Sequence, residues 1–227
     1  MSFIASYAYL SGARALFLLI SLALTGCSLP RNDAGVLLHD FGPGARQIRP
    51  GDRAEVLPPL ELAPVQASAA LGGTALLYRL MYADAQQPQA YAHSRWSMPP
   101  ALLVDQRLRE RLGLRRAVLH PGAVAPPRSA SAAAVAITEP ALLKLQVDLE
   151  EFSQLFDTPD SSSALVRLRA TVLVRRVTGD ALLAQRSFIA QQTAPTADAS
   201  GGVQALAATT DQAITELQAW LAQLPDH

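Results

Sequence analysis

The residue with the most distinctive chemistry in this chain is Cys27, the only cysteine among 227 residues. With no second thiol it forms no disulfide within the chain, so burial alone must stabilise the fold. Cys27 follows an apolar stretch from Ala15 to Leu24, with Arg14 as a positive flank. Ten apolar residues rise only about 15 Å as a helix, half the thickness of a bilayer core. A positive flank, a short apolar run and small residues before the cysteine are typical of a cleaved secretory signal.

The segment Leu24-Thr25-Gly26-Cys27 resembles the lipobox of bacterial lipoprotein precursors. This resemblance implies a diacylglyceryl group on the Cys27 sulfur, removal of residues 1–26, and acylation of the new amino terminus, for example with palmitate. Because each buried CH₂ contributes about 0.8 kcal/mol, two or more such chains hold a protein on a bilayer. Ser28 follows, where aspartate usually signals retention at the inner membrane, so attachment to the outer membrane, facing the periplasm, is favoured. An ordinary secreted protein with a chance cysteine is the alternative.

No other residues form a recognisable catalytic or metal-binding pattern. The histidines are far apart in sequence and none has the spacing of a metal-ligand pair on a helix. They are His39, His93, His120 and His227. Glu150 and Glu151 are adjacent, so on a strand they would face opposite sides and could not act as an acid–base pair. We therefore expect neither an enzyme nor a cofactor.

Two groups of residues are candidates for binding a partner. Arg107 and Arg111 belong to a local basic cluster that either meets anionic headgroups or an acidic partner, or forms a solvated helix face with ion-paired neighbours. The cluster consists of arginines 107, 109, 111, 115 and 116. Trp96, beside Arg95, either fills the corner between a strand and a helix or provides a partially exposed hot spot.

Composition excludes one class of partner. Basic and acidic residues number 19 each, and removing residues 1–26 takes away one arginine and no acid, which leaves 18 against 19 and a net charge of −1. A nearly neutral chain produces no overall field that would attract nucleic acid. The remaining chain is long enough for one domain, since about 170 residues bury close to 70% of their unfolded surface.

The chain divides into three parts. Residues 1–26 are the expected signal peptide, residues 27–58 the lipid anchor and flexible tether, and residues 59–224 an α+β domain. Frequent proline and glycine interrupt every apolar run of the tether, whose fully stretched length is about 100 Å. The segment Val36-Leu37-Leu38 and Phe41 are the residues of the tether that could instead dock on the domain.

Alternation of apolar and polar residues predicts strands in the domain. They span residues 60–62, 76–82, 89–96, 143–150, 166–175 and 182–191, with a short one within 115–119; Gln86-Gln87-Pro88 is a predicted break. Antiparallel pairing of 143–150 with 166–175 places Leu149 opposite Leu168, Val147 opposite Ala170 and Leu145 opposite Val172. The same register sets Asp148 against Arg169 and Glu150 against Arg167. The turn between them is predicted at Asp157-Thr158-Pro159-Asp160 and the three serines that follow.

Two amphipathic helices complete the prediction. One begins after Pro99-Pro100 and presents Ala101, Val104, Leu108 and Leu112 on one face; the other runs from Val203 to Leu224. The closing helix has no lysine or arginine on its polar face, so packing on the sheet is favoured over membrane binding. The expected fold is α+β, with one mainly antiparallel sheet of about five to six strands and both helices on one face.

In combination, several short segments resemble the ABC-type transport auxiliary lipoproteins. They are Leu77 to Tyr82, Tyr91 to Pro100 with the following helix, Glu150-Glu151-Phe152, Ala164 to Val174, Arg186-Ser187-Phe188 and the closing helix. The resemblance implies a periplasm-facing lipoprotein that assists an MCE-type transporter, comprising an ATPase, a permease and a membrane-anchored substrate-binding subunit, which moves phospholipids or other hydrophobic molecules. Such a family has no catalytic residues. An envelope lipoprotein that activates a cell-wall synthase is the alternative, and a homo-oligomer is left open.

Overall fold

The computed structural model describes residues 35–44, 57–123, 142–176 and 179–224. Its folded unit extends over Val36–His227. In chain order the elements are β1 (Leu37–His39), β2 (Leu60–Leu62), β3 (Gln66–Ala67), a 3₁₀ turn (Ala69–Leu71), β4 (Ala75–Leu80), β5 (Asp84–Trp96), α2 (Pro100–Gly113), β6 (Val118–Leu119), β7 (Leu143–Thr158), β8 (Ser161–Arg176), β9 (Gly179–Thr193) and α3 (Ala199–Leu221).

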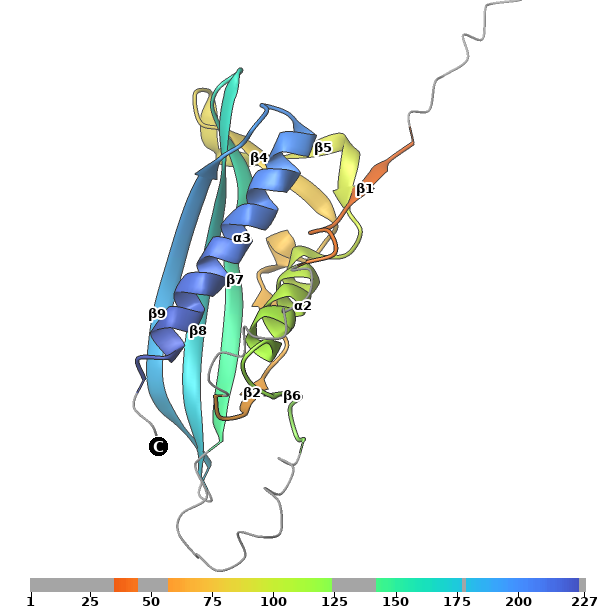
Figure 1. Cartoon of the computed structure of the whole chain (residues 1–227). Helices are drawn as coiled ribbons and strands as arrows, with labels where there is room; N and C mark the ends of the chain where they lie inside the picture. Colours follow the sequence, from red (N-terminus) through yellow and green to blue (C-terminus); the bar gives the residue numbers. More distant parts are fainter. Residues whose placement is uncertain (1–34, 45–56, 124–141, 177–178, 225–227) are drawn as a thin grey trace, which may run out of the picture. The chain divides into compact units, whose positions relative to one another are not determined.

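The described strands form one sheet of nine, built around β7 (Figure 1). On one side of β7, β8 and then β9 follow in antiparallel pairing. On the other side β2, β3 and β4 pair with successive parts of β7, all of them parallel to it. β5 pairs antiparallel with β4, while β1 lies parallel to β5 and β6 parallel to β2.

The α+β class is confirmed, but the predicted size and pairing of the sheet are wrong. The sheet is mixed and larger than the expected five to six mainly antiparallel strands. The two strands that the alternation did not predict are β1 and β3, whose three and two residues are too few for a reliable alternating pattern. Parallel pairing of such short strands with β7 also leaves no hairpin signal in the sequence, because parallel partners are not joined by tight turns.

The register of the β7–β8 hairpin is confirmed for most of the predicted pairs. Leu149 lies opposite Leu168, Val147 opposite Ala170, Leu145 opposite Val172 and Asp148 opposite Arg169. The predicted pairing of Glu150 with Arg167 is wrong, because a bulge between Leu149 and Glu151 inserts one extra residue into β7 and sets Glu151 against Arg167. The displaced Glu150 carboxylate instead accepts hydrogen bonds from Arg169.

Two predicted chain breaks are also corrected. The hairpin turn consists only of Pro159 and Asp160, since Thr158 still belongs to β7 and Ser161 already opens β8. β5 runs through the segment 86–88 that was predicted to interrupt it. Pro88 is tolerated there because the β4–β5 register shifts between Tyr78 and Leu80, where the ladder is irregular.

Both helices cover the same face of the sheet, with α3 over β7, β8 and β9 and α2 beside it (Figure 1). The α2 side chains that enter the core are Leu103, Val104, Leu108 and Leu112, whereas Ala101 is only partly buried. α3 contributes Leu206, Ile214 and Leu217, at the predicted helical spacing. No helix in the described ranges combines the length and apolarity needed to cross a membrane.

Candidate functional site

A short segment ahead of the predicted domain packs on it, and we call residues Val36–Gly44 the strap. Within the strap, β1 pairs with the end of β5, so that Leu38 lies opposite Arg95 and His39 opposite Trp96. The backbone N–H of Ser97 donates to the carbonyl of His39 at 2.8 Å. Of the two alternatives left open by the sequence, docking on the domain is the one that this part of the segment 27–58 adopts.

Beyond β1 the strap turns inward and packs a partly buried aromatic side chain against the core. The Phe41 ring meets Trp96 edge-on at 5.7 Å between centroids and lies 6.1 Å from Phe152. Trp96 and Phe152 are themselves 5.4 Å apart. Three segments that are distant in sequence thus share one aromatic cluster, which fixes the strap to the core.

Trp96 belongs to this core. Its side chain is 1% exposed and therefore offers no surface to a partner. The interpretation of Trp96 as a filler of the strand–helix corner is the one that its burial supports. Arg95 precedes it on β5 and is exposed. Because neighbouring strand residues face opposite sides, Arg95 projects from the face of the sheet that the helices leave uncovered.

Arg107 is the residue that joins the strap to both helices. It lies on α2, is 6% exposed, and donates through Nη2 to the carbonyl of Phe41 at 2.5 Å. Its guanidinium lies 5.8 Å from the centre of the Phe41 ring and within 3.7 Å of an Asp211 carboxylate oxygen on α3. Glu110, one turn further along α2, is 3.9 Å from Arg107 Nη1. The Arg107 guanidinium, which was predicted as a candidate for partner binding, thus makes its contacts within the protein.

Two further arginines of the cluster, Arg109 and Arg111, are also held by internal contacts. Arg111 Nε lies 3.7 Å from the same Asp211 oxygen, and the Arg111 carbonyl accepts from Gln218 of α3 at 3.0 Å. Arg109 pairs with Asp105 at 2.7 Å and donates to the carbonyl of Leu62 at 3.0 Å. The interpretation of this helix face as ion-paired is therefore supported, although its charges pair with other elements as well as with neighbours on α2.

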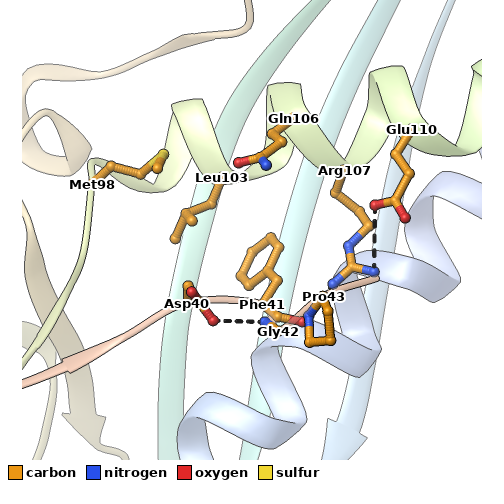
Figure 2. Close-up of a pocket in the computed structure, with 9 residues that line it drawn as sticks. All are labelled: Asp40, Phe41, Gly42, Pro43, Met98, Leu103, Gln106, Arg107 and Glu110. Atoms are coloured by element: carbon orange, nitrogen blue, oxygen red, sulfur yellow. Dashed lines mark hydrogen bonds and ion pairs between the residues drawn. The ribbon is translucent and has the colours of Figure 1, made fainter. Parts of the chain in front are cut away.

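A cavity of about 370 Å³ lies between the strap and α2. Figure 2 shows its lining, in which Phe41 and Leu103 approach each other and Arg107 closes one end. The lining residues are Asp40, Phe41, Gly42, Pro43, Met98, Leu103, Gln106, Arg107 and Glu110. Asp40 accepts a hydrogen bond from the Gly42 backbone N–H at 2.8 Å, which closes the turn of the strap. Gly44 must approach Glu110 closely, since a Cβ there would lie 2.0 Å from its Oε1.

The carboxylates of this cavity take part in contacts that hold the strap. The two carboxylates are engaged, Asp40 with the strap backbone and Glu110 with Arg107. Over the described ranges, no group of three or more histidine, cysteine, aspartate or glutamate side chains is placed to hold a metal ion. The geometry instead serves to fasten a chain segment.

A second buried polar group, which the sequence did not reveal, lies between β5, β7 and the start of α3. The Tyr91 hydroxyl donates to Gln154 Oε1 at 2.9 Å, and Gln154 Nε2 donates to Ser162 Oγ at 2.7 Å and to the Asp198 carbonyl at 3.2 Å. Burial, followed by the nearby Tyr78 and Asp198, raises the pKa of the Tyr91 phenol. It stays protonated as a donor, so this network is structural. A glutamine within a strand gives no periodic signal, so the sequence could not have indicated this network.

The predicted lipidation site, Cys27, lies outside the described residues. Of the other predicted site residues, Trp96 and Arg107 lie together around Phe41, whereas Arg95 lies on the opposite face of the sheet. Arg111 approaches the same cluster through Asp211. Arg107 and Arg111 make intramolecular contacts and Trp96 is buried, while a role of any of the four residues in binding another protein stays a prediction.

Two solved structures share this fold. The crystal structure of protein XCC0632 from Xanthomonas campestris has a TM-score of 0.62 and 15% sequence identity, with coverage of 82% of this chain and 94% of the other. A crystal structure of an uncharacterized protein has a TM-score of 0.55 and 12% identity, covering 82% and 99%. A comparison with curated proteins finds no match.

The family is shown by a sequence model that matches most of the chain. It describes the ABC-type transport auxiliary lipoprotein component and matches residues 42–219. The matched range begins within the strap, one residue after Phe41, and ends in α3, so it includes Arg107, Asp211, Trp96 and Phe152. The chain thus belongs to the family of ABC-type transport auxiliary lipoproteins.

Proposed function

We propose that this protein is a non-enzymatic lipoprotein of the outer membrane, facing the periplasm, which docks an MCE-type ABC transporter for phospholipids or other hydrophobic molecules. Its membership in the auxiliary lipoprotein family supports a role beside a transporter. The lipobox ending at Cys27 and the serine at position 28 support the anchor and its address. The contacts around the cavity fasten a chain segment, which supports a mechanism in which the protein holds its partner in place.

The main support for a positional mechanism is the strap. If residues 28–58 were all free, the 31 residues from Cys27 to Pro58 would extend to about 100 Å. Because β1 pairs with β5 and Phe41 packs against the core, only the ten residues 28–37 lead from Cys27 to the first paired position of β1. These reach at most about 35 Å when fully extended. The domain is then held within a short distance of the leaflet that carries the acyl chains.

The surface left for a transporter subunit is the face of the sheet away from the helices. Its charges are partly neutralised by cross-strand pairs, such as Arg79 with Glu151 at 3.4 Å and Lys144 with Asp180 at 3.2 Å. Arg95 projects on this face, and we propose it as the contact residue among the four candidates. Arg107 and Arg111 act indirectly, by fixing the strap and the helices.

Two measurements test the proposal. Intact mass of protein extracted from the native envelope should show residues 27–227 with acyl groups, and Cys27→Ser should abolish acylation and outer-membrane fractionation. Unmodified Cys27, or retention of residues 1–26, would contradict the proposed attachment to the outer membrane.

Co-purification tests the partner. We expect an MCE-type substrate-binding subunit to be captured with the native lipoprotein and to be lost or strongly reduced with Arg95→Ala. Arg176→Ala, an exposed arginine at the end of β8, is the matched control and should leave capture unchanged. Deleting the gene should alter outer-membrane permeability or detergent sensitivity. Capture of a cell-wall synthase in place of any transporter subunit would favour the other function.

A further inference from the structure

The strap begins with three consecutive exposed apolar residues. Val36 is 48% exposed, Leu37 62% and Leu38 68%. Successive residues of a strand point to opposite faces, so Leu37 and Leu38 expose apolar surface on both sides of β1. In the part of the chain that the structure describes, β1 pairs with β5 alone, and its other edge is open.

This apolar run differs from the other exposed apolar side chains. Leu102 and Leu114 lie twelve residues apart on and just beyond α2, and Leu182 and Ile189 lie seven apart on β9. Met81 and Tyr82 are adjacent, but they are two residues in the turn between β4 and β5 and not a run of three on a strand edge. Isolated apolar residues are normal on a protein surface, whereas contiguous ones mark an interaction site. An open edge strand is usually protected by charged residues or proline. Residues 36–38 contain neither.

The position of the run in the chain indicates what covers it. Only eight residues, 28–35, separate Cys27 from Val36, and they span at most about 29 Å. A lipid surface is thus within reach whenever Cys27 is acylated. Arg95 lies beside Leu38 in the register and is exposed, so a cation accompanies the apolar run. An apolar group flanked by a cation is the pattern that suits the boundary between acyl chains and anionic headgroups.

We infer that Val36–Leu38 inserts into the leaflet that holds the acyl anchor and forms a second membrane contact, which fixes the orientation of the domain. This inference rests on the proposed function, because it requires acylation of Cys27. The contact converts a single flexible point of attachment into two. The end of the sheet that carries β1 and β5 then faces the lipid.

Depth-dependent fluorescence quenching of the full acylated protein tests the inference. Cys27 is the only native cysteine, so once it is acylated the substitution Leu38→Cys provides a single free thiol for an environment-sensitive fluorophore. The labelled lipoprotein is reconstituted into vesicles of phosphatidylethanolamine and phosphatidylglycerol, with or without lipids that carry a nitroxide on the acyl chain. Leu182→Cys is the matched control, since Leu182 is 66% exposed and lies on β9.

We expect nitroxide lipids to reduce the fluorescence at position 38 by about twofold or more, as for a side chain 5–10 Å inside the interface, and to leave position 182 nearly unchanged. No quenching at 38, or equal quenching at both positions, would overturn the inference while acylation, checked by mass, still supported the proposed function. A fluorophore at 38 that is already shielded in detergent, before vesicles form, would assign the edge to a second protein chain and would also overturn it. An unacylated Cys27 would sink the proposed function and this inference together.

Discussion

At the scale of single residues, Arg107 has the largest set of structural contacts in the candidate site. One guanidinium binds the Phe41 carbonyl of the strap, approaches Asp211 of α3 and lies near Glu110 of its own helix. A hydrogen bond to a charged group contributes about 1.5–3 kcal/mol, and a buried donor or acceptor that loses its partner costs a similar amount. Arg107 should therefore matter for stability more than a surface arginine.

We predict that Arg107→Met lowers the free energy of unfolding by about 1.5–3 kcal/mol, since methionine keeps the apolar stem and removes the donors. Arg107→Lys should restore only part of the loss, because one ammonium cannot reproduce the planar fork. Urea unfolding monitored by circular dichroism measures the change. Arg111→Met is the control and should cost less, as its side chain is 27% exposed. Equal losses for the two variants would contradict the assigned role of Arg107.

Asp198 has a local role of a different kind, as the N-cap of α3. Its Oδ1 accepts from the Gly201 backbone N–H at 2.8 Å and from the Thr196 hydroxyl at 2.8 Å. These hydrogen bonds, first that of Gly201 and then that of Thr196, lower the pKa of the Asp198 carboxyl below its usual 3.8. A depressed pKa means that the ionised group stabilises the fold above its unfolded pKa and stops doing so as pH falls through its folded pKa.

We predict that Asp198→Ala lowers the free energy of unfolding by about 0.5–2 kcal/mol at neutral pH, as loss of an N-cap usually does. The difference from the native protein should shrink as the pH falls below about 4, where the unfolded carboxyl begins to bind a proton, and its charge-dependent part should be gone below the lower pKa of the folded carboxyl. Asp198→Asn keeps a capping oxygen and should be nearly neutral at pH 7. Thermal unfolding at a series of pH values measures this. If the difference in stability between the native protein and Asp198→Ala stays constant down to pH 2, the charge of Asp198 does not contribute to the cap.

At the scale of elements, the start of α3 is limited by close packing as well as by its cap. A Cβ added at Gly201 would lie 2.1 Å from the backbone carbonyl oxygen of Thr196, which cannot move without shifting the chain. At Gly113, the last residue of α2, no atom lies within 4 Å of an added Cβ. Alanine favours helix over glycine by about 1 kcal/mol at unhindered positions.

The same substitution should therefore have opposite effects in the two helices. We predict that Gly201→Ala destabilises the protein by about 1–3 kcal/mol through overpacking, despite its better helix propensity. Gly113→Ala should stabilise it by up to about 1 kcal/mol. Chemical unfolding of both variants under identical conditions measures the two changes in the free energy of unfolding. Stabilisation by Gly201→Ala would show that the start of α3 can shift away from Thr196.

The elements that could be predicted from the sequence are those whose own pattern is long enough. The β7–β8 register followed from alternation, since a slip of one residue would have exposed Leu145, Val147 and Leu149. The bulge had a signal too: Glu150 and Glu151 are consecutive polar residues that interrupt the alternation before Phe152. β3, with two residues, had none. Its position is fixed by β7, and that contact is not encoded in its own residues.

In the candidate site, the sequence indicated which residues could be functional, but for Trp96 and Phe41 it did not indicate how deeply they pack. Arg107 follows Leu103 by four residues, which places both on one helix face, so its contact with the core had a signal in the spacing. Trp96 was compatible with both the core and a partner, with the core favoured. The deciding residue was Phe41, whose burial against Trp96 depends on pairing of β1 with β5 and has no signature in a segment rich in proline and glycine.

At the scale of the whole molecule, the strap decides how the folded unit relates to its proposed anchor. It contributes one short strand, one aromatic ring and one carbonyl that Arg107 holds. These contacts are few compared with those of the β7–β8 hairpin. The strap should therefore open locally, with a free energy well below that of global unfolding. Opening would lengthen the connection to Cys27 from about 35 Å to about 100 Å.

We predict that Phe41→Ala releases the strap and leaves the rest of the fold intact. Removing the partly buried ring forfeits up to about 3 kcal/mol of apolar burial, which raises the population of the open strap. Hydrogen exchange followed by mass spectrometry should show faster exchange in peptides that contain 36–41, with unchanged protection in β7 and β8. Tyr82→Ala removes an aromatic ring that is 51% exposed, and it should leave exchange in the strap as in the native protein.

The same variant connects local opening to the proposed function. Phe41→Ala should be acylated at Cys27 normally, because the substitution lies fourteen residues beyond it. If a short connection to the membrane is what the transporter requires, this variant should reproduce much of the detergent sensitivity of a gene deletion at normal protein level. Shortening the segment 45–56 in this variant should compensate in part, since that segment belongs to the connection that the open strap adds. Full activity of Phe41→Ala, with fast exchange in the strap confirmed, would mean that the transporter does not depend on the distance that the strap sets.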